Sequence, residues 1–334
     1  MSTVDERNEK IRQILDALYI RAIKNGAEID ESAYKDSLDK LFSTTAWGFR
    51  EILLVVVIAM RLDTTFRAST RLYDCNPRAI YEDPIKEFLV EKNIPHRKSG
   101  PLNVAKATVG LDMTWAAQRR PSDVAREVVH LVNYMETDDD NSENKVNDIG
   151  TSLLRRLITY ADSLTALRVE TEPSEDPDYL YHLCYELITQ IPDAGNTPQK
   201  ISALLLKCYH TFFHTGIEVT VKHFDIARIR DSYDCISIYN EKHSTGIHEI
   251  IVICRREDCP PDMEFSNLHG YIGKYCYKTI TYYYLNIYEW ISNLLHHMTP
   301  EGRKGFYLLL NDYINETNTS ESVKKLWKKL NSPT

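Results

Sequence analysis

The residues with the clearest catalytic potential lie in one stretch, Gly216 to Arg256, where carboxylates stand near the ends of expected strands. Ile217 to Phe224 alternates branched apolar and polar residues, which is typical of a strand with two unlike faces. Cys235 to Tyr239 reads as a second short strand, and the apolar run Ile250 to Cys254 is typical of a strand buried on both faces. A helix followed by such a meander, with carboxylates at strand ends, is one way to build a nuclease metal site. A small mixed sheet with charged ends and no catalytic role is the alternative.

A second candidate is the basic segment between Arg97 and Arg126. It holds six Lys or Arg residues against two Asp residues, a local net charge of +4 in a chain whose net charge is −8. Lysine and arginine near glycine and backbone amides are what a phosphate-contacting surface requires, and Gly100, Asn103 and Trp115 could also approach a ligand there. The phosphate-loop patterns GxxxxGKS and GxGxxG are absent. The segment is therefore either a contact surface for phosphates or an ordinary solvated loop; its basic residues are Arg97, Lys98, Lys106, Arg119, Arg120 and Arg126.

The elements that must position these residues are mostly helical before the strands begin. Val4 to Asn25 is amphipathic, with Ile11, Ile14, Leu15, Leu18 and Ala22 on one face. The most apolar run, Ile52 to Met60, is nine residues long, whereas a bilayer span needs about 20, so it predicts a buried helix and no membrane association. We therefore expect an α+β fold in which a mostly helical, DNA-contacting N-terminal lobe, residues 1–195, packs on a small mixed β-sheet with flanking helices, residues 196–334.

Length and composition set wider limits. At 334 residues the chain suggests two intimately packed lobes with a sizeable core. The seven cysteines are odd in number and scattered, and no CxxC pair occurs, which favours a reducing, cytoplasmic compartment over a disulfide framework or a zinc ribbon. The polar N-terminus does not read as a signal peptide. The negative net charge argues against a protein that is basic all over, but nucleic-acid affinity depends on local charge.

The order of features along the chain resembles that of type II restriction endonucleases of the SacI type. A helical N-terminal region contains the apolar helix that ends in VVVIAMRLD, and the irregular segment YDCNPRAIYEDPIKEFLVEKNIPHRKSGPLNVAKA follows. A C-terminal sheet lies beyond it, and the chain closes with MTPEGRKGFYLLLNDYI and SVKKLWKKL. The part RKSGPLNVAKA is the most specific. The resemblance implies the PD-(D/E)xK nuclease fold, in which an Asp, a second acidic residue and a Lys on neighbouring strands bind Mg²⁺ and activate water.

Carried over to this chain, the resemblance makes Asp234 the metal-binding Asp. The next strand has Ile253 or Cys254 where the second acidic residue is expected, so this chain departs from the family spacing. Glu249 could join Asp234 at the metal from the beginning of that strand. An earlier register would instead use Glu218 with Lys222, or Asp225 with Asn240 and Lys242.

The resulting hypothesis is a sequence-specific, Mg²⁺-dependent endonuclease of double-stranded DNA that acts as a homodimer, because a palindromic site mirrors a two-fold axis. The residues expected to meet DNA are Arg97, Lys98, Asn103, Lys106, Arg119 and Arg120. Two alternatives stay open: a catalytically silent relative that binds DNA or a partner in a defence system, and a helical scaffold without nucleic acid. The pair His210 and His214, at i and i+4 of a helix, could hold a metal, but without a third ligand a structural role is favoured.

Overall fold

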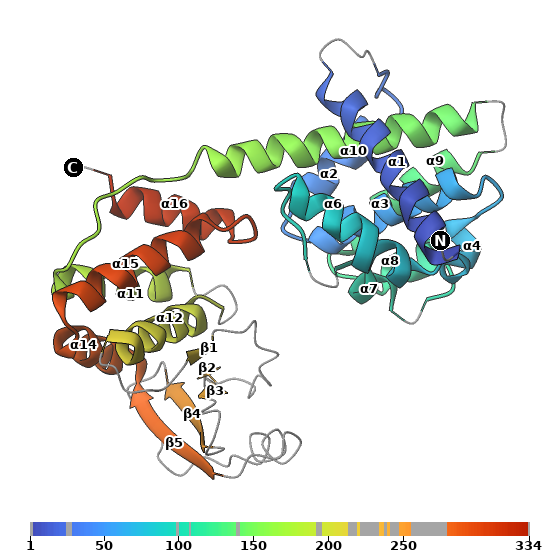
Figure 1. Ribbon diagram of the computed structural model, residues 1–334. Coiled ribbons are helices and arrows are strands. Elements are labelled where there is room, and N and C mark those ends of the chain that lie inside the picture. The colour runs from blue at the N-terminus through green and yellow to red at the C-terminus, as the bar shows by residue number, and fades with distance from the viewer. Residues whose placement is uncertain are drawn as a thin grey trace. The chain divides into compact units, whose positions relative to one another are not determined.

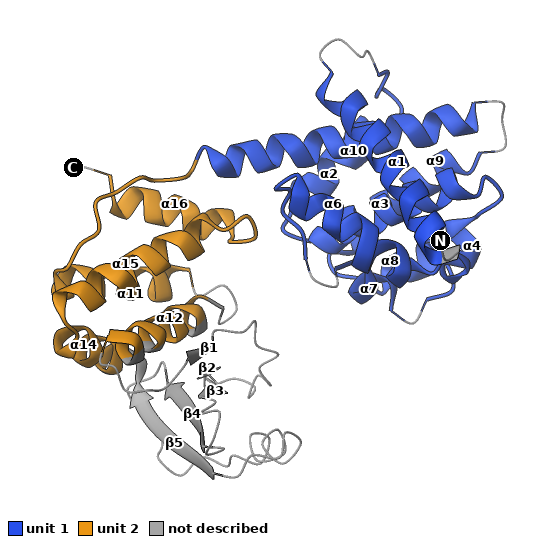
Figure 2. Cartoon of the chain, in the orientation of Figure 1, with its two compact units in different colours: residues 1–166 blue, residues 167–334 orange. Residues whose placement is uncertain are grey.

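The computed structural model divides the chain into two compact units, residues 1–166 and 167–334, which are described separately (Figures 1 and 2). The described residues are 3–24, 29–97, 100–106, 108–137, 141–191, 196–212, 219–220, 234–236, 239–240, 247–254 and 279–332; in the strands among them the description covers the backbone. The boundary expected after residue 195 falls inside the second unit, between two of its helices.

Unit 1 is built around α3, Trp47–Leu62, whose residues from Phe49 to Met60 are all buried. The prediction of a buried helix over Ile52 to Met60 is confirmed. Helices pack on several sides of α3, so it has no polar face to offer water. The other helical elements of unit 1 are α1 (Thr3–Ile23), α2 (Lys35–Phe42), α4 (Ala68–Arg71), η1 (Leu72–Cys75), α5 (Pro77–Ile80), η2 (Tyr81–Ile85), α6 (Lys86–Glu91), α7 (Gly100–Ala105), α8 (Met113–Ala117), α9 (Ser122–Met135) and α10 (Ser142–Thr165).

Two of these helices show how the sequence determines the packing around α3. In α1, Ile11, Leu15, Leu18 and Ala22 recur every three or four residues and are buried, as their spacing predicts. In α10, Gly150 lies against α3: a Cβ atom built there would stand 2.7 Å from a methyl carbon of Val57. A larger residue at position 150 would push α10 away from α3.

Unit 2 has its own helical core. Its buried side chains come from α11 (Pro177–Gln190), α12 (Asn196–Phe212), α14 (Ile287–His297), α15 (Pro300–Asn315) and α16 (Glu321–Leu330). Trp327 of α16 and Phe306 of α15 are fully buried in it. The terminal helix containing KKLWKKL is thus part of this core through its apolar residues.

The predicted α+β fold is wrong: the described chain is mostly helical, and helices with their connecting loops supply the side chains of both described cores. Strand backbone runs over β1 (Val219–Thr220), β2 (Asp234–Ile236), β3 (Tyr239–Asn240), β4 (Ile247–Cys254) and β5 (Thr279–Asn286). β1 pairs with β3, and β4 pairs antiparallel with β2 and parallel with β5. The strand patterns within 216–256 predict strands, but helical periodicity governs the packing of both cores that the structure describes.

Candidate nucleic-acid interface

The structure describes only two of the predicted catalytic residues, Asp234 and Glu249, and these by their backbone. Asp234 begins β2 and Glu249 lies within β4; in the backbone register Asp234 is opposite Ile253, and Glu249 is opposite Thr281. Glu218, Lys222 and Lys242 lie outside the described residues, as does His214. Among the side chains that the structure describes, no group of three or more His, Cys, Asp or Glu could hold a metal ion. The Mg²⁺ site at Asp234 and Glu249 therefore stays a prediction.

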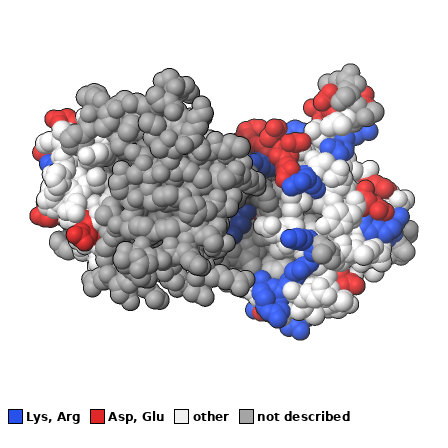
Figure 3. All heavy atoms as spheres, turned by 90° about the horizontal axis from the view of Figure 1, so that it is seen from below, with Lys and Arg blue, Asp and Glu red and all other residues white. Residues whose placement is uncertain are grey.

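The structure describes all but one of the predicted DNA-contacting residues. Arg97, Asn103, Lys106 and Arg120 are exposed, Arg119 is half-buried, and Lys98 lies outside the described residues. Asn103 sits on α7, and Arg119 and Arg120 come just after Gln118, the C-cap of α8. On the coloured surface of unit 1, Figure 3 shows groups of Lys and Arg as well as groups of Asp and Glu, with uncharged surface between some of them. We call the surface of unit 1 that carries Arg97, Lys106, Arg119, Arg120 and Arg126 the basic surface.

The cations of the basic surface share one property, which is that they form no ion pair within the described residues. Within the described residues, Arg97, Lys106, Arg119, Arg120 and Arg126 have no carboxylate within salt-bridge distance. Several other cations of unit 1 do pair with carboxylates, for example Arg12 with Asp16 and Glu91, Arg21 with Asp148, Arg61 with Glu143, Arg78 with Glu82, and Arg156 with Glu31 and Asp39.

The two acidic residues of the segment are occupied. Asp112 caps α8, with a carboxylate oxygen 2.7 Å from the Trp115 amide nitrogen, and Asp123 pairs with Lys40 at 2.8 Å. Both carboxylates of this segment thus bind structural partners, an amide of α8 and Lys40. Of the six predicted cations, the five that the structure describes are exposed or half-buried and have no carboxylate partner among the described residues.

Hydrogen bonds from unit 1 fix the first part of the basic surface at Arg97. The Arg97 amide donates to Glu51 Oε1 of α3 at 2.5 Å, and the Tyr81 hydroxyl donates to the Arg97 carbonyl, also at 2.5 Å. Both polar groups of one peptide segment are therefore held by side chains that are buried beneath it. The Arg97 guanidinium stays exposed while its backbone is anchored.

Close backbone packing fixes the next residues. A Cβ atom on Gly48 of α3 would stand 2.7 Å from the Gly100 carbonyl oxygen, and one on Gly100 would stand 1.5 Å from Glu51 Oε2. Helices α3 and α7 can approach so closely only because both positions are glycine. The indole of Trp115 donates to the Val104 carbonyl at 2.8 Å, which ties α8 to α7.

Glu51 is the least expected residue of this arrangement. It is 4% exposed, and its second oxygen, Oε2, has no hydrogen-bond partner within the described residues. Burial raises the pKa of Glu51 to about 7, although the Arg97 amide, the Tyr81 hydroxyl and the charges of Arg97 and Arg50 favour the ionised form. The hydrogen bonds and charges around Glu51 therefore offset only part of the free-energy cost of burying its ionised carboxylate.

The neighbouring Arg50 anchors another side of α3. Its guanidinium carbon lies 4.4 Å from the ring centroids of Phe42 and Trp47 and 5.7 Å from that of Tyr160. Its Nε donates to the Leu41 carbonyl at 2.9 Å, and another nitrogen donates to the Thr44 carbonyl. Burial lowers the pKa of Arg50 to about 10. These contacts join α2, α3 and α10, so Arg50 has a structural role.

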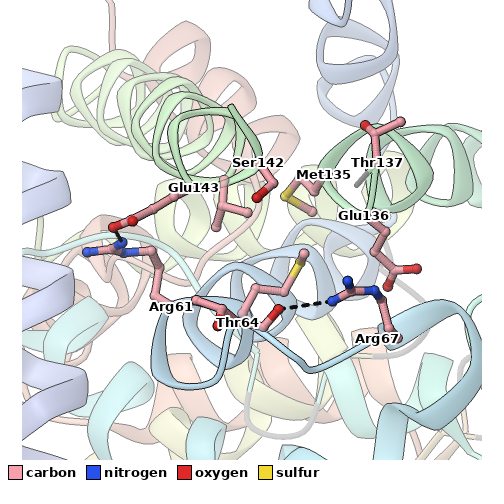
Figure 4. A pocket seen from close by; sticks show the side chains of 10 residues that line it. Arg61, Thr64, Arg67, Met135, Glu136, Thr137, Ser142 and Glu143 are labelled. Atoms are coloured by element: carbon pink, nitrogen blue, oxygen red, sulfur yellow. Dashed lines mark hydrogen bonds and ion pairs between the residues drawn. The ribbon is translucent and has the colours of Figure 1, made fainter. Parts of the chain in front are cut away.

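Unit 1 has a small pocket whose polar lining groups bind one another or nearby backbone groups. It has about 360 Å³ of space that includes open solvent, and its lining includes Arg61, Thr64, Arg67, Glu136 and Glu143. Figure 4 shows Arg61 directed to Glu143 and Arg67 to Thr64. Arg61 pairs with Glu143, Arg67 donates to the Thr64 carbonyl at 3.0 Å, and Glu136 accepts from the Ser69 amide at 3.0 Å. These partners explain the polar lining without a ligand.

Sequence reasoning found the basic surface but missed the buried Glu51 and Tyr81 that hold Arg97, and the neighbouring Arg50. One signal was present, since Arg50 and Glu51 directly precede the most apolar run of the chain, and a charged pair there requires buried partners. The partners themselves lie far away in sequence, 46 residues in the case of Glu51 and Arg97.

Comparison with known proteins adds no family to this description. No protein-family model matches the sequence, and no curated protein matches it at a significant level. In the described part of the chain, no helix combines the length and apolarity that crossing a bilayer demands. The resemblance to SacI-type restriction endonucleases accordingly stays a hypothesis, and function has to be argued from the basic surface.

Proposed function

We propose that the chain binds double-stranded DNA through the basic surface and acts on it as a Mg²⁺-dependent endonuclease of the type II restriction type. The observation that carries the DNA-binding part is the run of exposed cations that have no carboxylate partner within the described residues. Such cations can replace the counterions of DNA phosphates without first breaking an ion pair. The cleavage part rests on the resemblance of RKSGPLNVAKA and its flanks to SacI-type enzymes.

The anchored backbone supports binding by a preformed surface. The Arg97 peptide and α7 are fixed by buried groups, so little backbone entropy is lost when the cations meet phosphate. A homodimer that places two basic surfaces on one palindromic site is part of the same proposal. A catalytically silent relative would share the DNA binding and lack the cleavage.

The binding test compares two triple variants. Arg97, Lys106 and Arg120 are changed to Gln in one, and the ion-paired Arg12, Arg21 and Arg78 are changed to Gln in the matched control. Binding of a random-sequence duplex pool is followed by fluorescence anisotropy across a salt series. Each lost phosphate contact reduces the slope of log K against log salt by about 0.9. We expect a reduction approaching 3 and an affinity loss on the order of 100-fold for the first variant, and little change for the control.

Cleavage is tested separately on a mixed-sequence plasmid with Mg²⁺, with EDTA, and with Asp234→Ala. Discrete fragments that disappear in both controls would support the endonuclease and place its metal near Asp234. DNA binding without cleavage would favour the silent relative. Equal loss of affinity in both triple variants, or no salt-dependent binding, would contradict the proposed role of the basic surface.

A further inference from the structure

An apolar patch made by Tyr73, Val109 and Met113 adjoins the cations of the basic surface. Among the described residues these are large apolar side chains that remain exposed, at 53%, 78% and 47% respectively. Val109 lies in the turn between α7 and α8, and Met113 is the first residue of α8. Tyr73 of η1 reaches the same place, because its hydroxyl donates to the Ala105 carbonyl at 3.0 Å. Large apolar side chains that are exposed near one another can mark a binding surface.

The turn that carries Val109 is rigidly anchored. The Val109 carbonyl accepts from the Leu72 amide at 2.9 Å, and the Leu111 amide donates to the Ala68 carbonyl at 2.9 Å. Gly110 presses against α4 so closely that a Cβ atom there would stand 2.0 Å from the Ser69 carbonyl oxygen. The Val109 side chain is therefore held outward by its backbone rather than left outside by a loose loop.

The charges around the patch narrow the choice of partner. Lys106 precedes the turn, and the Arg119 guanidinium donates to the Lys106 carbonyl at 2.7 Å. These two cations have no carboxylate partner in the described structure. Of the two nearby carboxylates, Asp74 pairs with Arg71 and Asp112 caps α8. The charge beside the patch that has no partner among the described residues is therefore positive. A partner must then combine negative charge at the rim with an apolar group between. The major groove of DNA offers this combination, because phosphates line its walls and thymine presents a 5-methyl group.

We propose that the apolar patch of Tyr73, Val109 and Met113 contacts thymine 5-methyl groups in the major groove and so contributes to sequence selection. This inference rests on the proposed DNA binding and adds base readout to it. The cations position the duplex, and the apolar side chains distinguish thymine from bases that lack the methyl group.

The test begins with selection of duplexes from a random-sequence pool by the wild-type chain. The enriched duplexes are then synthesised with thymine or with uracil, which differs only by the missing methyl group. We expect the wild type to bind the uracil duplex about fourfold more weakly for each methyl group contacted. Val109→Ala and Met113→Ala should bind the two duplexes more nearly equally, whereas Ile20→Ala, a change at another exposed apolar residue, should keep the full difference.

Three outcomes would overturn the inference. Equal wild-type affinity for thymine and uracil duplexes would remove base readout by methyl contact while leaving DNA binding intact. Salt-dependent binding without any enriched sequence would do the same. Absence of DNA binding, as judged by the salt series, would remove both proposals and would favour an acidic protein as the partner of this surface.

Discussion

Glu51 in unit 1 and Lys324 in unit 2 are both buried charges, at 4% and 2% exposure, but their surroundings differ. The Lys324 ammonium donates to the carbonyls of Ile314 and Glu316, at 2.7 Å each, where α15 ends. Carbonyls at a helix end lack partners within the helix and carry partial negative charge. Lys324 therefore supplies missing donors to α15 and receives compensation for its own charge.

Glu51 is compensated less completely. One carboxylate oxygen accepts from the Arg97 amide, and the other has no hydrogen-bond partner within the described residues. The comparison indicates that Lys324 closes a helix, whereas Glu51 holds a surface segment in place at a cost in stability. Natural chains retain such costs most readily where a site needs them.

The largest effect expected from this difference is on the pH dependence of unit 1. The pKa of Glu51 in the folded chain is raised to about 7, above that of an unfolded Glu. Its contribution to stability is thus fully present below the unfolded pKa and is lost as pH rises through 7. Wild type should lose about 3 kcal/mol relative to Glu51→Gln between pH 4 and 8, from 1.36 kcal/mol per pKa unit.

The measurement is urea unfolding of both proteins at several pH values, followed by hydrogen-exchange mass spectrometry on peptides from α3. Comparison at the same pH removes the effect of pH on intrinsic exchange. Near pH 4 the two proteins should unfold at similar urea concentrations, which serves as the internal control. A stability difference that stays constant with pH would contradict a titrating Glu51.

A smaller effect is expected from Lys324→Met in unit 2. The methionine can fill the buried space, but the carbonyls of Ile314 and Glu316 lose their donor, which costs roughly 2 kcal/mol. Exchange in α15 and α16 peptides should rise, and exchange in α3 should not. Lys325→Met is the matched control, because Lys325 is exposed and pairs with Glu321 on the surface, where an ion pair contributes little. Equal effects of both variants would show that Lys324 does not close α15.

The sequence predicted most where short-range patterns decide the structure. The burial of α3 followed from its apolar run, the inner face of α1 followed from Ile11, Leu15, Leu18 and Ala22, and the positive charge of residues 97–126 followed from composition. These features depend on residues within a few turns of one another.

The sequence predicted least where distant segments meet. The alternation over 217–224 and the apolar run over 250–254 suggested a fold built on a small sheet, but short strand patterns do not reveal the helix packing that tertiary contacts establish. The anchoring of Arg97 by Glu51 and Tyr81 depends on three segments that fold together, and the exposure of Val109 depends on the fit of Gly110 against Ser69. No local pattern contains that information.

The smallest predicted effect is on DNA affinity, and it tests most directly whether the two buried charges have different roles. Glu51→Ala removes the acceptor of the Arg97 amide and should loosen the start of the basic surface, so DNA affinity should fall roughly fivefold, equivalent to about 1 kcal/mol. Glu51→Gln keeps an acceptor oxygen and should bind DNA nearly as wild type does. Lys324→Met should leave affinity unchanged although it destabilises unit 2. Anisotropy titrations with one duplex at one salt concentration would measure all three.

If Glu51→Ala and Lys324→Met weakened binding equally, general destabilisation would explain the loss, and Glu51 would have no specific role in positioning the basic surface.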